Sequence, residues 1–87
     1  MRDSDKLRIM LELLQDCGVA VRQAPPGGDS AGALVRLRGR EVLFLDAGAD
    51  VPEQIELIAA ALRGRAELDD RFLPPEIRQT VEGPEVE

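Results

Sequence analysis

The sequence predicts one α+β domain, in which helices cover one face of a three-stranded, mostly antiparallel sheet in the chain order α-β-β-β-α-α. The length of 87 residues corresponds to a single domain. Apolar side chains recur at helical spacing in residues 5–17 and 52–63, and the residues between them contain short apolar runs typical of strands. Glycine and proline separate these segments, as expected of turns.

The first helix is predicted at residues 5–17, with Ser4 or Asp3 as its N-cap and Gly18 at its end. Its buried stripe contains Leu7, Met10, Leu11, Leu14 and Cys17. A cysteine on such a stripe is interpreted as a small core residue.

Three strands are predicted to follow, at residues 19–23, 33–38 and 41–45. A loop rich in proline and glycine connects the first two, and a turn at Gly39 joins the last two into a hairpin. Val35 and Leu37 are expected to point toward the core. The third strand is apolar on both faces, which favours a central position in the sheet.

Asp50 is the predicted N-cap of the second helix, with Glu53 completing a capping box. A short last helix is predicted to begin near Pro74. These elements define a domain of residues 1–82, and residues 83–87 are expected to form a disordered acidic tail.

The predicted core combines the inward-facing apolar residues of these elements: Leu7, Met10, Leu11, Leu14, Val19, Val21, Val35, Leu37, Val42, Phe44, Ile55, Ile58, Ala59 and Leu62.

Ile9 and Leu13 widen the apolar arc of the first helix to ~200° of its circumference. A helix that packs on a sheet through one face buries an arc of little more than ~100°. Exposed apolar patches mark interfaces, so Ile9 and Leu13 are the predicted self-association residues of a homodimer. The alternative is that the C-terminal segment of the same chain covers them with its apolar residues, Phe72, Leu73, Ile77 and Val81.

The chemistry of common catalytic and metal sites is missing from the sequence. The chain has no histidine and a single cysteine, which removes histidine-based acid–base catalysis, nucleophile–histidine pairs and the common zinc sites. Asp46, Asp50 and Glu53 do not have the spacing of a calcium loop and are explained by helix capping. The sequence therefore predicts a protein that is not an enzyme and has no catalytic residues, metal or cofactor.

The charge of the chain argues against two classes of partner. The net charge is −6, and the second half carries all of the excess acid, so no nucleic acid or membrane partner is expected. The longest apolar run is far too short to span a bilayer, and a cytoplasmic location is expected. The preference for arginine over lysine resembles that of bacteria with GC-rich genomes.

Arg36, Arg38 and Arg40 are the predicted site for an anion or an acidic partner, on the expectation that they share one face of the hairpin. The alternative interpretation is a solvated sheet face whose charges discourage edge-to-edge pairing.

Residues 30–64 resemble the core of the ImmA/IrrE-type zincin-like metallopeptidases. The resemblance lies in the Arg- and Gly-rich hairpin, the strand Val42-Leu43-Phe44-Leu45-Asp46 and the helix that follows. The family's His-Glu-x-x-His site is absent: Ala60 and Ala61 stand in place of the first histidine and the glutamate, and Gly64 stands in place of the second histidine. The resemblance implies a core without a metal.

Residues 73–78, Leu-Pro-Pro-Glu-Ile-Arg, also resemble the end of other small bacterial proteins. The predicted function is a non-catalytic protein-interaction or adaptor module with an unknown protein partner. The alternative is a domain that binds an anionic ligand or an acidic partner through Arg36, Arg38 and Arg40.

Overall fold

The computed structural model describes residues 1–24 and 32–82 and confirms the α+β class and the predicted order of elements. The elements are α1 (Asp3–Asp16), β1 (Ala20–Ala24), β2 (Gly32–Leu37), β3 (Arg40–Asp46), α2 (Val51–Leu62), the 3₁₀ turn η1 (Ala66–Leu68) and α3 (Pro75–Glu82). The predicted loop rich in proline and glycine and the predicted disordered tail fall on residues 25–31 and 83–87, which lie outside the described residues. None of the described helices has the length and apolar character that crossing a bilayer requires.

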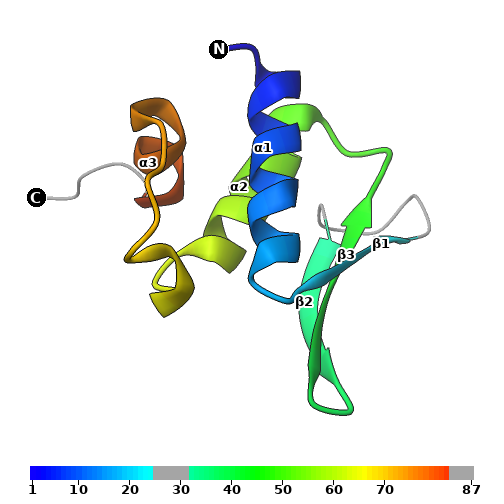
Figure 1. Ribbon diagram of the computed structural model, residues 1–87. Coiled ribbons are helices and arrows are strands. Elements are labelled where there is room, and N and C mark those ends of the chain that lie inside the picture. The colour runs from blue at the N-terminus through cyan, green and yellow to red at the C-terminus, as the bar shows by residue number, and fades with distance from the viewer. Residues whose placement is uncertain (25–31, 83–87) are drawn as a thin grey trace, which may run out of the picture.

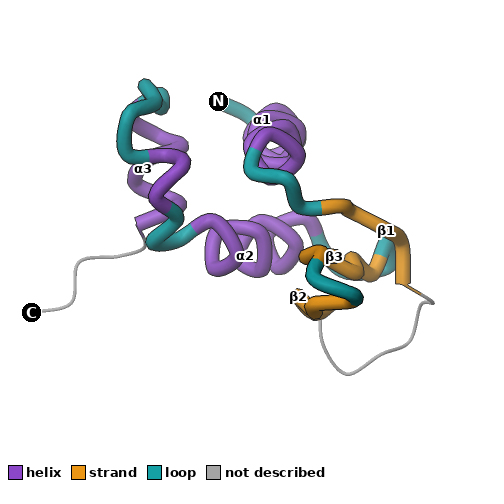
Figure 2. The backbone as a smooth tube through the Cα atoms, turned by 60° about the horizontal axis from the view of Figure 1, so that its bottom comes forward, coloured by secondary structure: helices purple, strands orange, loops and turns teal. Residues whose placement is uncertain are grey.

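The sheet has the strand order β1-β3-β2, so β3 is central, as its two apolar faces predict. The β2–β3 pair is antiparallel and forms the predicted hairpin, whereas β1 runs parallel to β3. The sheet is therefore mixed, and β1 and β2 are its two edges. The helices lie to one side of this sheet, and the hairpin turn extends beyond them (Figures 1 and 2).

A two-residue turn, Arg38-Gly39, closes the hairpin. Both residues have positive φ angles, 51° and 79°, as in the type I′ turn that matches the twist of paired strands. Glycine adopts this conformation freely, but Arg38 does so at a cost of about 1 kcal/mol. The turn therefore fixes the register in which Leu37 pairs with Arg40 and Arg36 with Glu41.

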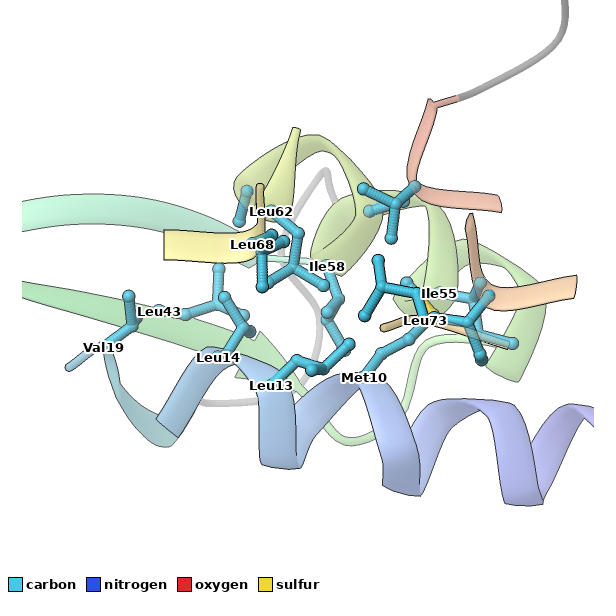
Figure 3. Close-up of a cluster of buried hydrophobic side chains, with 14 residues drawn as sticks. Met10, Leu13, Leu14, Val19, Leu43, Ile55, Ile58, Leu62, Leu68 and Leu73 are labelled. Carbon is cyan, nitrogen blue, oxygen red and sulfur yellow. The ribbon is translucent and has the colours of Figure 1, made fainter. Parts of the chain in front are cut away.

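The main core lies between the helices and one face of the sheet. Figure 3 shows Met10, Leu13 and Leu14 pointing from α1 into a cluster that includes Ile58 and Leu62 of α2. The sheet contributes a fully buried side chain from its central strand, Leu43. Dense contact among aliphatic side chains is the main source of stability in a domain of this size.

The sequence-based prediction assigned the wrong face of the hairpin to the core. Leu43 is buried against the helices, so its neighbours Val42 and Phe44 point to the opposite face because side chains alternate along a strand. Val42 is buried as predicted, but Leu37, which shares this opposite face, is 52% exposed. Apolar residues at consecutive positions of β3 hide the alternation that would have identified the correct face.

The predicted helix caps are also incorrect in detail. The N-cap of α1 is Arg2 rather than Ser4 or Asp3, which lie inside the first turn. Asp50 is the N-cap of α2 by position, but its side chain makes no capping hydrogen bond. Acidic residues in the first turn of a helix are still favourable because they interact with the helix dipole.

The C-terminal segment covers the apolar face of α1 within one chain. Leu13 is 5% exposed and belongs to the same buried cluster as Leu73, Ile77 and Val81, and Ile9 is half-buried against that cluster. The exposed Ile9–Leu13 patch on which the predicted homodimer rests is therefore absent from the single chain, and the homodimer itself stays a prediction. Phe72 takes no part in this cover, because it is 83% exposed.

Candidate functional site

The three arginines predicted as a binding site all lie on the β2–β3 hairpin and are exposed to solvent. Arg36 pairs with Glu41 and shares the helix-side face with Leu43, whereas Arg40 pairs with Leu37 and shares the opposite face. Arg38 lies at the tip, in the turn. The expectation that the three share one face is therefore wrong: they surround the end of the hairpin.

None of the hairpin arginines has a partner among the described residues. The arginines after β3 differ: Arg65 contacts Glu41, Arg71 contacts Asp16 and Arg78 contacts Glu82. The guanidinium of Arg63 also donates to a backbone carbonyl, that of Val81. In a chain with a net charge of −6, the hairpin thus carries three arginines without an ion pair among the described residues, whereas the arginines after β3 are paired.

The carboxylates of the sheet are already engaged and do not neutralise these arginines. Glu41 accepts two hydrogen bonds from Arg65, at 2.8 and 2.7 Å. The side chain of Asp46 is buried and accepts a hydrogen bond from the backbone N–H of Gly48, at 2.8 Å. The electrostatic surface of the hairpin is therefore basic.

Exposed apolar side chains accompany the basic groups. Leu37 is 52% exposed on the face away from the helices, and Leu34 is 39% exposed on the helix-side face. Both belong to β2, an edge strand. The exposure of Leu34 could not be predicted from the sequence, because the pattern of β2 does not reveal that the strand lies at an edge.

The Glu41–Arg65 ion pair joins the hairpin to the end of α2. The guanidinium of Arg65 binds the carboxylate of Glu41 through two nitrogens, and its Nε donates to the carbonyl oxygen of Ala61 at 2.6 Å. Arg65 is 13% exposed, and a bidentate pair of this kind has a defined geometry. The basic hairpin is thereby fixed to the helical layer.

The hydrogen bonds from Arg65 hold the pKa of Glu41 below its ordinary value of 4.5, and the nearby charge of Arg36 lowers it further. A carboxylate whose pKa is lower in the folded state stabilises the fold above its unfolded pKa, and this contribution is lost as the pH falls through the folded pKa. We expect Glu41→Gln to lower the free energy of unfolding by roughly 1 kcal/mol at neutral pH. Urea unfolding at a series of pH values measures the difference.

The difference between the wild type and Glu41→Gln should shrink as the pH falls below 4.5. Glu56→Gln is the matched control, because Glu56 is exposed in the middle of α2 and forms no ion pair with the described residues. A difference for Glu41→Gln that stays constant across this pH range would contradict the assignment of the ion pair.

The other candidate positions have fewer of the features of a reactive or ligand-binding site. The thiol of Cys17 is half-buried against the core, and burial together with the charge of Glu67 raises its pKa, which disfavours the reactive thiolate. Gln54 is buried and its amide donates to the carbonyl oxygen of Asp46 at 2.8 Å, so this pair holds the β3–α2 connection in place. Among the described residues, no group of three possible metal ligands is assembled.

A shallow hollow lies between the end of α2, η1 and α3. Its lining residues are Leu62, Gly64, Arg65, Leu68, Asp69, Leu73, Arg78, Val81 and Glu82. Both arginines that line it already have carboxylate partners. The hollow is therefore a weaker candidate than the basic hairpin.

Comparisons with protein-family models, with characterised proteins and with solved structures found no match to this chain. The resemblance of residues 30–64 to ImmA/IrrE-type metallopeptidases thus remains a prediction from the sequence.

Proposed function

We propose that this protein is a non-catalytic interaction module that binds an acidic segment of a partner protein through Arg36, Arg38 and Arg40. The observation that carries this proposal is the contrast between these three unpaired arginines and the paired arginines that follow β3. Arginine is well suited to such contacts because its planar guanidinium binds carboxylates through two hydrogen bonds. Exposed Leu34 and Leu37 beside them supply apolar contact area.

The positions of the arginines favour a protein segment over a small anion. Arg36 and Arg40 lie on opposite faces of the hairpin and Arg38 lies at its tip, so the three cannot converge on one small ion. A segment with several carboxylates can contact more than one of these arginines at the same time. A net charge of −6 opposes the approach of nucleic acids at long range, whereas a short acidic segment interacts mainly with the local charge.

The backbone at Arg38 gives further support. Its φ of 51° lies in the left-handed region, where asparagine or glycine fits better. A residue kept in such a conformation costs the fold some stability, and such positions are frequent at functional sites. An arginine at the tip of the turn therefore fits a role in binding better than a role in folding.

The test is to reverse the charges in Arg36→Glu/Arg38→Glu/Arg40→Glu and to measure binding of a short, fluorescein-labelled polyglutamate peptide by anisotropy. The wild type should bind this peptide more tightly than an uncharged peptide of the same length, because the attraction is electrostatic. The variant should bind at least ~tenfold more weakly, a loss of about 1.4 kcal/mol. Circular dichroism checks that both proteins are folded.

The matched control is Arg2→Glu/Lys6→Glu/Arg8→Glu, which changes the total charge equally but lies at the start of α1. It should retain most of the binding. Equal losses in the two variants would show that net charge alone governs the interaction, and this result would refute the proposed site. An unaffected hairpin variant, or a wild type that does not bind polyglutamate, would also refute it.

A further inference from the structure

The outer edge of β2 has the features of a site for strand addition. We infer, on the basis of the proposed function, that the acidic segment binds as an extended strand that pairs with β2 and enlarges the sheet. Strand addition supplies affinity through main-chain hydrogen bonds, and side chains on the two faces supply specificity. Three features of β2 support strand addition: its main chain, its exposed side chains and its charge.

The main chain of β2 presents unpaired polar groups at the edge. In a hairpin closed by a two-residue turn, the residues next to the turn exchange both hydrogen bonds, and such pairs recur at every second position. Leu37 pairs with Arg40 and Val35 with Val42, so the N–H and C=O groups of Leu34 and Arg36 point away from β3. No backbone hydrogen bond to these outward groups is found among the described residues.

The side chains of β2 are left exposed on both faces of the sheet. Leu34 lies on the helix-side face at 39% exposure, and Leu37 lies on the opposite face at 52%. A strand placed beside β2 would contact both, because side chains of neighbouring strands pack beside each other on each face. The other edge, β1, has no exposed large apolar residue.

The basic charge around β2 indicates that the added strand is an acidic segment and not β2 of a second copy of the chain. Pairing β2 with itself would put Arg36 of both copies on the two strands of the seam, with Arg38 in the adjacent turn and Arg40 one strand away on β3. Like charges brought together in this way destabilise a sheet. An incoming strand that alternates glutamate with an apolar residue would place its acids beside Arg36 and Leu34 on the helix-side face. Its apolar side chains would lie beside Val35 and Leu37 on the opposite face. The proposed ligand is therefore an extended segment with alternating acidic and apolar residues.

The test compares Leu34→Pro with Leu34→Val, using a fluorescein-labelled peptide of alternating glutamate and valine as the probe. Proline removes the outward N–H of residue 34 and leaves the hydrogen bonds between β2 and β3 intact, since edge strands tolerate proline on the solvent side. Valine shortens the same side chain and keeps the N–H. We expect Leu34→Val to bind nearly as the wild type does and Leu34→Pro to bind at least ~tenfold more weakly.

Amide hydrogen exchange of the wild type provides a second measurement that does not depend on the folding of the proline variant. Saturation with the peptide should slow exchange at the amides of Leu34 and Arg36, which point outward in the free protein. Unchanged exchange at these amides, equal binding by Leu34→Pro, or no binding of the alternating peptide would overturn strand addition. The proposed function would survive any of these results as long as the hairpin charge reversal still weakens binding of polyglutamate.

Discussion

Replacing Ile77 by alanine is expected to lower the free energy of unfolding by about 2–5 kcal/mol, which is the cost of removing a large buried aliphatic side chain. Ile77 is fully buried although it belongs to α3, the last described helix. Its side chain packs in the same cluster as Leu13 and Leu73, so truncation leaves a cavity where the C-terminal segment covers α1. Urea unfolding followed by circular dichroism gives the change directly.

Gln79→Ala is the control, because Gln79 is exposed on the same helix and its removal creates no cavity. We expect this change to alter stability by no more than about 0.5 kcal/mol. Equal stability of Ile77→Ala and the wild type would show that α3 does not belong to the cooperative unit. Sedimentation equilibrium of Ile77→Ala also tests whether the C-terminal segment covers α1. Weaker packing of this segment should expose Leu13 and promote association of the variant.

Gly32→Ala is expected to destabilise the protein by about 2–4 kcal/mol, through both backbone strain and overpacking. Gly32 has a φ of 146°, which side-chain-bearing residues rarely adopt. A Cβ at this position would also overlap the carbonyl oxygen of Phe44 and lie 2.9 Å from the Cδ2 of Leu57. Because the first of these neighbours is backbone, β2 and β3 would have to separate locally.

The variant Gly18→Ala separates the effect of backbone strain from that of overpacking. Gly18 also has a positive φ, 84°, but a Cβ there would meet no atom within 4 Å, so we expect a loss of about 1–2 kcal/mol from strain alone. Thermal or urea unfolding of both variants gives the comparison. A Gly32→Ala protein that is as stable as Gly18→Ala would show that β2 does not approach Phe44 and Leu57 so closely.

The helices could be predicted well because their signals are local. The spacing of Met10, Leu14, Ile55 and Ile58 follows the helical repeat, and all four are buried as expected. Gly39 likewise marks the hairpin turn, which lies within one residue of its predicted place. In each case the relevant contacts involve residues near one another in the chain.

The candidate site could be predicted only in part. The three arginines are visible in the sequence and are exposed, but their division between the two faces depends on the pairing of β2 with β3. The identification of β2 as an edge depends in turn on β1 taking the other side of β3, and this parallel pairing joins residues far apart in the chain. No local pattern encodes such a choice.

The sequence by itself determined the class of fold, the approximate extent of the elements and the absence of histidine, because these depend on composition and on short-range periodicity. The tertiary structure decided which face of the hairpin meets the helices and whether Leu13 is exposed. The physical reason is that β3 is apolar at consecutive positions and α1 is apolar over more than one face. Several packings would bury enough apolar surface, and the long-range contacts of β1 and α3 select one of them.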